Sequence, residues 1–351
     1  MSLFLSEFGV SLLEIWRSRK PPMTNLTIWP WRLGTRSMRS RFTSTIIILS
    51  VVCFFVISIS GSYGQGLPDI RSVPADLTVP EMGIGKPAAG LRVKQVLPGY
   101  EKTELYHSLY LPTADKLAPA TPDEDKTPPS GKKRRLPVLV ELSGNGGFRS
   151  KYGDESIGRP EGSCLGYGIS GGKDFIWVVL PFVNGAGDDV ATKWWGDAPQ
   201  YDPQPTIDYC TKAVPWICEQ YGGDPDMVFL VGFSRGAIAC NYIGLYDDKI
   251  SKLWRGFVAY SHYDGARRWG YPKSDAASAK VRLERLGDRP QFLCHEGNSV
   301  SQTKTYLEST GIAGDFTFAP TGFRNHNDQW TLRPCATRKQ LRSWLDTQLA
   351  K

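Results

Sequence analysis

The 351-residue chain lacks the short motifs that bind metals or cycle disulfides. It contains no C-x-x-C, no H-E-x-x-H and no H-x-H. Its four histidines are widely scattered, at His107, His262, His295 and His326. Zinc and similar metals need histidine, cysteine and carboxylate ligands at characteristic close spacings. We therefore expect neither a dedicated metal site nor a cofactor.

The chain also has little net charge once its N-terminal region is set aside. The whole sequence holds 42 Lys and Arg against 35 Asp and Glu. Residues 1–64 account for seven of the basic and two of the acidic residues, which leaves 35 basic and 33 acidic residues in the remainder. A balanced domain does not offer the positive surface that nucleic acids need. We expect no nucleic-acid partner.

Long apolar segments are scarce, and the one strongly apolar run is Ile46 to Ser60. It is shorter than the roughly 20 residues that a membrane-spanning helix needs. Arg39 and Arg41 precede the run, and Ser62-Tyr63-Gly64 offers a small-x-small cleavage site after it. This order predicts a signal peptide within residues 1–64 and export to the periplasm or the outside. The alternative is a membrane anchor formed by an uncleaved 46–60 segment.

Six cysteines follow this leader, and export would permit disulfides between them. Cys210 and Cys218 are expected on one helix, about 12 Å apart along its axis, which is too far for a mutual bond. Cys240 and Cys294 lie in apolar runs and are expected to be core thiols. The pairing of the others, Cys164 and Cys335, stays open.

Beyond the leader, apolar strands alternate with helices. Residues 1–64 include a possible over-extended start, residues 65–90 form an N-terminal extension, and residues 91–351 form one domain. A Pro-, Asp-, Lys- and Thr-rich surface loop at 112–135 interrupts this domain and cannot build a core. Alternating buried strands and helices predict an α/β fold, with a mostly parallel central sheet and helices on both faces. We expect strands at Leu91–Leu97, Leu105–Leu111, Leu136–Leu142, Phe175–Phe182, Trp254–Ser261, Gln291–Cys294 and Asp315–Ala319, and helices at Thr206–Tyr221, Ala237–Leu245, Thr303–Thr310 and Thr337–Leu349.

The most informative motif is G-x-S-x-G at Gly232 to Gly236. A buried apolar run precedes it and a buried helix is expected after it, which is how hydrolases expose a nucleophilic serine. We predict Ser234 as the nucleophile, with the backbone N–H of Arg235 facing an oxyanion. Gly168 to Gly172 also matches the pattern around Ser170. That segment lacks a following helix, and we expect it to be a flexible loop.

A serine nucleophile needs a base and an orienting acid. His326 lies in a polar loop between the last expected strand and the last helix, and we predict it as the base. His262 and His295 are the reserve candidates. For the acid the sequence leaves two main alternatives open. Glu296 follows the penultimate strand, whereas Asp264 follows the strand before it, and Asp328 is a further possibility.

Two further segments are expected beside the nucleophile. The glycine-rich turn Ser143 to Phe148 follows the first buried strand, and its Asn145 and Gly146 are predicted to supply the second oxyanion donor. The loop holding Trp194 and Trp195 and the loop Arg267 to Tyr271 would project at the same sheet edge. The two tryptophans either stack on a sugar or aromatic acyl group or anchor their loop in the core.

Together these residues resemble the α/β-hydrolase superfamily over roughly residues 91–350. The resemblance rests on the Gly232–Gly236 turn, the chain order of serine, acid and His326, and the glycine turn, which begins with Ser143 instead of the usual histidine. The exported form, without a long cap, resembles secreted feruloyl and acetyl esterases, polyhydroxyalkanoate depolymerase-like proteins and dienelactone-hydrolase-like proteins, and the resemblance does not choose among them. The resemblance implies an exported serine hydrolase that cleaves small-molecule or polysaccharide esters through an acyl-enzyme, without a cofactor.

Two other functions remain open at this point. A serine peptidase or amidase would use the same residues. A non-catalytic carbohydrate-binding protein on a hydrolase fold would use the tryptophan loops and would not need the acid.

The leader generates a first testable prediction. The charged, apolar and small-residue order of residues 39–64 should lead to cleavage near Gly64 when the full chain is expressed in a secreting host. Mass spectrometry of the mature N-terminus measures this directly. A mature protein that still contains Ile46 to Ser60 would instead support the membrane anchor.

Overall fold

The computed structural model describes residues 66–113 and 135–351. The predicted signal peptide, its apolar run and most of the loop predicted at 112–135 lie outside these ranges. Within them, no helix combines the length and the apolar character needed to cross a membrane.

The described residues form a sheet of nine strands in the order β1-β2-β3-β7-β4-β8-β9-β10-β11. Strand β3 runs antiparallel to both of its neighbours, and the other neighbouring strands pair in parallel. A separate two-stranded ribbon joins β5 to β6. The bounds are β1 Met82–Ile84, β2 Arg92–Gln95, β3 His107–Tyr110, β4 Leu136–Leu142, β5 Phe148–Arg149, β6 Glu155–Ser156, β7 Ile176–Leu180, β8 Gly223–Phe233, β9 Gly256–Tyr260, β10 Gln291–His295 and β11 Phe316–Pro320.

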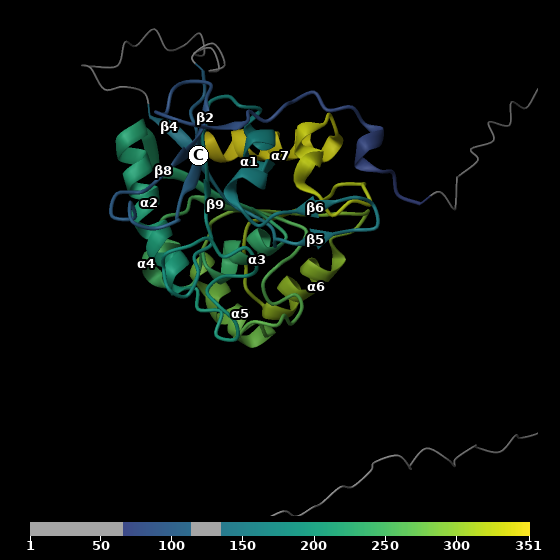
Figure 1. The fold of residues 1–351 in the computed structure, drawn as a ribbon. Coiled ribbons are helices and arrows are strands. Elements are labelled where there is room, and N and C mark those ends of the chain that lie inside the picture. The colour runs from purple at the N-terminus through teal and green to yellow at the C-terminus, as the bar shows by residue number, and fades with distance from the viewer. Residues whose placement is uncertain (1–65, 114–134) are drawn as a thin grey trace, which may run out of the picture. The chain divides into compact units, whose positions relative to one another are not determined.

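Helices cover both faces of this sheet (Figure 1). One face packs against α1 and α7, and the other against α2, α3, α5 and α6, which matches the division of the core into two clusters. The predicted α/β fold with a mostly parallel sheet is confirmed. The bounds are α1 Leu165–Ser170, α2 Gln204–Tyr221, α3 Arg235–Tyr242, α4 Asp248–Ser251, α5 Ala276–Leu283, α6 Ser301–Thr310 and α7 Ala336–Leu349, with single 3-10 turns at Ile70–Ser72, Pro160–Gly162, Glu284–Leu286 and Asp328–Leu332.

The central strands are apolar without alternation because both of their faces are covered. Every residue of β7 and of β9 is buried. A parallel sheet between two helix layers leaves no polar face along its inner strands. This is why their sequences stand out as short continuous apolar runs, and why their positions were predictable to within two residues.

The segment around Ser170 differs from the prediction. Gly168 and Ser170 belong to α1, and the helix ends at Gly171 in a left-handed conformation. A β-carbon at Gly168 would lie 2.1 Å from Thr331 Oγ1, so this glycine permits close packing against the 3-10 turn at Asp328–Leu332. The expected flexible loop is therefore wrong, because the glycines bring a buried helix against its neighbour.

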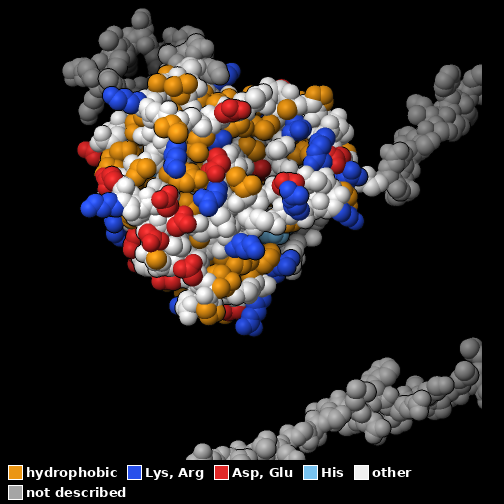
Figure 2. Space-filling model, in the orientation of Figure 1, with side chains coloured by type: hydrophobic (Ala, Val, Ile, Leu, Met, Phe, Trp, Pro, Cys, Tyr) orange, Lys and Arg blue, Asp and Glu red, His pale blue; other side chains and the backbone are white. Residues whose placement is uncertain are grey.

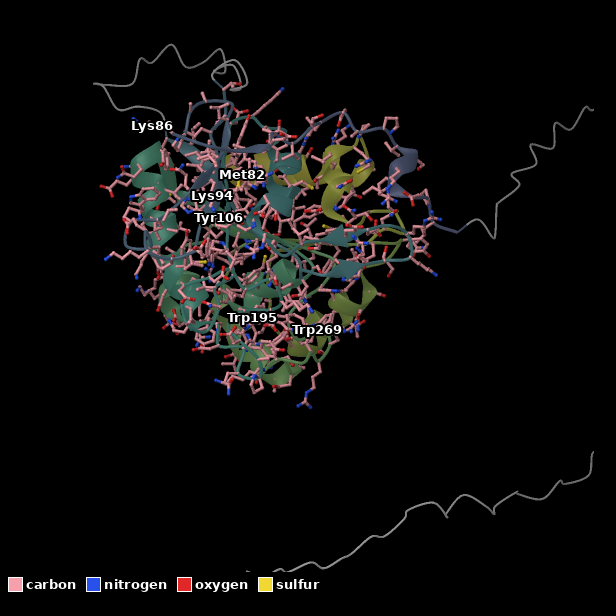
Figure 3. The ribbon with its side chains drawn as sticks, viewed as in Figure 1. Met82, Lys86, Lys94, Tyr106, Trp195 and Trp269 are labelled. Atoms are coloured by element: carbon pink, nitrogen blue, oxygen red, sulfur yellow. The ribbon has the colours of Figure 1, made fainter. Side chains whose placement is uncertain are left out.

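The N-terminal extension joins the domain at several places. Strand β1 pairs with β2 at one edge of the sheet, where Figure 3 labels Met82 and Lys94. Ile70 is buried, and its backbone N–H donates to Asn325 Oδ1 at 2.7 Å. The extension thus contacts the loop that carries His326.

The six cysteines within the described residues are unpaired. Cys240 and Cys294 are each only 1% exposed, in agreement with the prediction that they are core thiols.

A buried histidine in β3 makes the stability of this fold depend on pH. His107 is fully buried, with Nδ1 2.9 Å from the hydroxyl of Tyr209 and no hydrogen-bond partner for Nε2 among the described residues. Burial disfavours the imidazolium and lowers the pKa of His107 to about 3. An unfolded chain has a histidine pKa of about 6.5. The contribution of neutral His107 to stability is therefore complete above pH 6.5 and is lost as the pH falls toward 3.

We predict that His107→Gln lowers the melting temperature at pH 7 but flattens its dependence on pH between 7 and 5. Glutamine keeps a polar partner for Tyr209 and takes up no proton on unfolding. Thermal melts of both proteins across this range test the prediction. If the melting temperature falls equally in both proteins between pH 7 and pH 5, His107 does not cause the pH dependence of stability.

Candidate active site

Ser234 lies at a sharp turn between β8 and α3. Its backbone angles are φ 55° and ψ −112°, a strained conformation for a residue other than glycine. Two glycines make the turn possible. A β-carbon at Gly236 would lie 1.8 Å from the carbonyl oxygen of Leu142, and one at Gly232 would lie 2.2 Å from the backbone of Gly236. The turn therefore holds Ser234 at the carboxyl end of β8, beside the end of β4.

His326 links Ser234 to Glu296. Its Nε2 lies 3.0 Å from Ser234 Oγ, and its Nδ1 lies 3.1 Å from Glu296 Oε1. Glu296 follows β10 directly, and His326 lies in the loop after β11. Parallel strands bring these chain segments to the same sheet edge. The three residues predicted as nucleophile, base and acid are thus in hydrogen-bonding contact.

Asp264, the alternative acid, is occupied elsewhere. Its carboxylate is 1% exposed and pairs with Arg282, with contacts of 2.8 and 3.1 Å. Asp328 accepts from the backbone N–H of Cys164 at 3.3 Å and does not contact the imidazole of His326. Of the three carboxylates that the sequence offered, Glu296 is the one whose carboxylate contacts the imidazole of His326.

Ser261 is a member of this group that the sequence did not suggest. It follows β9, is fully buried, and has φ 89°. Its Oγ lies 2.8 Å from His326 Nδ1. The Nδ1 atom therefore faces two oxygens, those of Ser261 and Glu296. A proton on Nδ1 is favoured by both, which leaves Nε2 free to accept from the Ser234 hydroxyl.

Aromatic rings enclose the imidazole. The ring centroids of Phe148 and Phe233 each lie 4.8 Å from that of His326, and the ring of His262 lies at 5.2 Å. Burial opposes ionisation of Glu296, but its hydrogen bond to His326 and the charge of that residue lower the pKa of the carboxyl overall. Burial also lowers the pKa of His262, and positive charge on His326 lowers it further. The expected charges are thus a carboxylate at Glu296 and a neutral imidazole at His262.

Asp154 fixes the loop that carries His326. This fully buried carboxylate accepts from the backbone N–H of His326 at 3.2 Å and from Asn325 Nδ2 at 2.9 Å. Ser150 Oγ donates to it at 2.9 Å. Nothing in the local sequence marks Asp154, because its partners in the His326 loop lie more than 170 residues away.

The predicted oxyanion donors need one correction. The backbone N–H of Gly146 already donates to the carbonyl of Thr192 at 2.6 Å, so Gly146 is not available. The N–H groups of Asn145 and Arg235 have no hydrogen-bond partner within residues 66–113 and 135–351. Leu142 pairs in register with Gly232, which places the turn after β4 beside the turn at Ser234. Asn145 and Arg235 therefore remain the candidate donor pair.

The side chain of Arg235 ties together the loops around Ser234. The guanidinium is fully buried and donates to the carbonyl groups of Ala191 at 3.0 Å, Gly158 at 3.2 Å and Trp194. It also contacts the hydroxyl of Ser143 at 3.2 Å and lies 3.9 Å from the ring centre of Phe182. One side chain thus holds three separate loops against the turn at Ser234, with no carboxylate partner among the described residues.

Trp194 and Trp195 differ in burial: Trp195 lies in the core, and Trp194 is partly exposed. Trp195 is fully buried and stacks on Tyr242 with a centroid distance of 4.5 Å. The prediction that it contacts substrate is wrong, since it presents no face to solvent. Trp194 is partly exposed, and its backbone N–H donates to Asn145 Oδ1 at 2.8 Å. It lies next to the candidate oxyanion turn and stays a candidate for substrate contact.

In the part of the chain that the structure describes, no group of three or more His, Cys, Asp or Glu side chains has an arrangement suited to a metal ion. The residues around Ser234 are suited to nucleophilic attack and proton transfer.

No protein-family model and no curated protein matches this chain. Solved structures match its fold. A thermostable esterase shares 13% identity at a TM-score of 0.43 and covers 73% of this chain and 62% of its own. One of two fungal esterases from Rhizomucor miehei shares 13% identity at a TM-score of 0.46, and the match covers 81% of this chain and 91% of the esterase. An acylaminoacyl peptidase from Pyrococcus horikoshii shares 11% identity at a TM-score of 0.45, and the match covers 74% of this chain and 42% of the peptidase.

This chain therefore spans less than two thirds of the first esterase and of the peptidase. The molecule's own topology defines the class: its strand order, the turn after β8, and the chain order Ser234, Glu296, His326 are those of the α/β-hydrolase fold. The fold implied by the sequence resemblance is confirmed.

The site generates a prediction that separates the two carboxylates. Glu296→Gln should lower kcat for an aryl ester by roughly 10² to 10³, less than the ~10⁴ lost by a serine protease without its aspartate. The loss should be smaller because Ser261 Oγ still faces Nδ1. Steady-state kinetics on folded protein measures it.

Asp264→Asn is the matched comparison. It leaves Arg282 buried without its carboxylate, so it should lower the melting temperature and leave kcat per folded molecule nearly unchanged. The opposite ranking of the two kcat values would assign the orienting role to Asp264.

Proposed function

We propose that this protein is an exported serine hydrolase that cleaves carboxylic esters through Ser234, His326 and Glu296. The observation that carries the proposal is the continuous contact from Ser234 Oγ through both ring nitrogens of His326 to Glu296. A serine, a histidine and a carboxylate in this order form the group that activates a hydroxyl for acyl transfer. The signal-peptide pattern of residues 39–64 supports the export.

In the proposed reaction, Ser234 Oγ attacks the ester carbonyl carbon while its proton passes to His326 Nε2. The backbone N–H groups of Arg235 and Asn145 stabilise the negative oxygen of the tetrahedral intermediate. The C–O bond to the alcohol breaks, and His326 returns the proton to the departing oxygen. Water then attacks the acyl-enzyme by the same route, releasing the acid and restoring Ser234.

Glu296 acts on the imidazole throughout these steps. Its carboxylate favours the proton on Nδ1 and stabilises the imidazolium that forms when Nε2 accepts the serine proton. The rings of Phe148 and Phe233 limit the access of water to the imidazole, which strengthens this charge interaction.

Peptide or amide cleavage would use the same residues. No feature of the described residues favours an amide over an ester. We assign the ester because its alcohol leaves more readily than the amine of an amide. A non-catalytic role is disfavoured, since a binding protein has no use for a serine held in a strained turn and contacted by a histidine.

The decisive prediction concerns Ser234. Ser234→Ala should abolish hydrolysis of an aryl acetate, with a loss on the order of 10⁶ in kcat, and should prevent labelling by a fluorophosphonate probe. Circular dichroism should show an unchanged fold.

Ser170→Ala is the control, because Ser170 matches the same motif but lies at the end of α1. Its Oγ bonds only the local backbone, donating to the Tyr167 carbonyl at 3.3 Å and accepting from Gly172 at 3.2 Å. Full activity in Ser234→Ala, or lost labelling in Ser170→Ala, would overturn the assignment.

A further inference from the structure

Two cationic side chains lie on either side of an aromatic wall near His326, which is formed by Trp194 and Trp269. The side chains of Lys193 and Arg267 are exposed, and neither forms an ion pair within the described residues. They come from two separate loops, one before α2 and one after β9. Both loops project at the sheet edge that carries Ser234.

The position of Lys193 is set by its neighbours. Thr192 accepts a hydrogen bond from the backbone N–H of Gly146, and the N–H of Trp194 donates to Asn145 Oδ1. The backbone on both sides of Lys193 is thus tied to the candidate oxyanion turn. Its Cε would lie 3.6 Å from a β-carbon at Gly147. The ammonium group therefore lies over the rim of this turn.

Arg267 is held on the other side of the site. Its guanidinium lies 4.0 Å from the ring centre of Trp269. Together with His262, Trp269 and His295 it lines a small cleft. The ring of Trp269 lies 4.8 Å from that of His262, which in turn contacts His326. Burial is the main cause of the lowered pKa of His262, and the positive charge of Arg267 adds to it.

A contact between two aromatic rings connects the loop of Lys193 to the loop of Arg267. Trp194, next to Lys193, lies 5.6 Å from Trp269 between ring centres. Figure 3 labels Trp269 near Trp195, well apart from the edge strands that carry Met82 and Lys94. On the face drawn in Figure 2, acidic side chains gather toward the lower left, and basic side chains lie beside the hydrophobic patch at the lower centre. A ring-bearing group lying against Trp194 and Trp269 would meet Lys193 at one end and Arg267 at the other.

The carboxylates near this wall do not neutralise it. Glu296 bonds His326, and Glu155 pairs with Arg149 at 3.3 Å. Asp197 keeps its negative charge, but its carboxylate accepts from the backbone N–H of Gly185 at 2.9 Å and forms no ion pair with Lys193 or Arg267 among the described residues. Unpaired positive charge at the mouth of a cleft attracts anionic ligands and disfavours cationic ones.

We propose that the site selects esters that carry a carboxylate, with an aromatic or sugar ring on the Trp194–Trp269 wall and the carboxylate against Arg267, assisted by Lys193. This inference rests on the proposed hydrolase function and names the substrate class of the same site. Trp194 and Trp269 supply the surface for the ring, and Arg267 and Lys193 determine the specificity.

The test compares matched esters that differ in one charge. On the alcohol side, 4-acetoxybenzoate is compared with its neutral methyl ester. On the acyl side, 4-nitrophenyl hemiglutarate is compared with 4-nitrophenyl valerate. At low ionic strength, at least one anionic ester should have a kcat/KM about fivefold or more above its neutral partner. The preference should shrink in 0.5 M NaCl, because solvent-exposed charges are screened.

The variants identify the residues responsible. Arg267→Gln should reduce the anionic-to-neutral ratio of kcat/KM by about fivefold, as expected for one partly exposed charge contact, and Lys193→Gln should reduce it by about twofold. Arg267→Lys keeps a cation over Trp269 and should retain most of the ratio. Arg268→Gln is the matched control, since Arg268 is an exposed neighbour without a contact to the wall and its removal should leave the ratio unchanged.

The outcomes separate this inference from the function on which it rests. Equal kcat/KM for charged and neutral esters, or a preference that survives in Arg267→Gln together with Lys193→Gln, would overturn the inference and leave the hydrolase intact. If Arg268→Gln lowers the anionic-to-neutral ratio of kcat/KM as much as Arg267→Gln does, the preference is a general effect of surface charge, and the inference is overturned as well. Failure to cleave any of the four esters, with Ser234 unlabelled, would overturn the function itself.

Discussion

The close approach of α3 to the end of β4 is the constraint on which the site depends. The backbone at Gly236 lies so near the Leu142 carbonyl that no side chain fits between them. This approach forces Ser234 into its positive φ and points the first turn of α3 at the carboxyl edge of the sheet. Every other group in the site is placed relative to that edge, since His326, Glu296 and Ser261 each follow a strand that ends there.

A second constraint follows from the residue next to Ser234. A buried guanidinium costs several kcal/mol in desolvation unless its N–H groups find acceptors. Arg235 finds them in the backbone carbonyls of three loops, at Ser143, at Gly158 and at Ala191 and Trp194, and a cation–π contact with Phe182 adds to this. These loops are thus ordered by the need of one buried guanidinium for hydrogen-bond acceptors. The turn at Ser234 and the loops around it are therefore parts of one assembly.

Much of this arrangement was predictable from the sequence, because it follows from the order of elements. Ser234 was identified by the strand–turn–helix pattern, and Glu296 and His326 by their places after particular strands. Predictions that depended on side-chain direction or on distant contacts did not all hold. Trp195 lies in the core, and the backbone N–H of Gly146 donates to the carbonyl of Thr192. Ser261 and Asp154 carried no local signal, because their importance comes from partners more than 60 residues away.

The bracing of the site by Arg235 has a consequence for how it comes apart. Its guanidinium ties the turn at Ser234 to the loops of Ser143, Gly158 and Trp194. The His326 loop is held by a different anchor, the carboxylate of Asp154, which accepts from Asn325 and from the backbone N–H of His326. A substitution at Asp154 would therefore release the imidazole and leave Ser234 and its surrounding loops in place, whereas a substitution at Arg235 would release three loops at once.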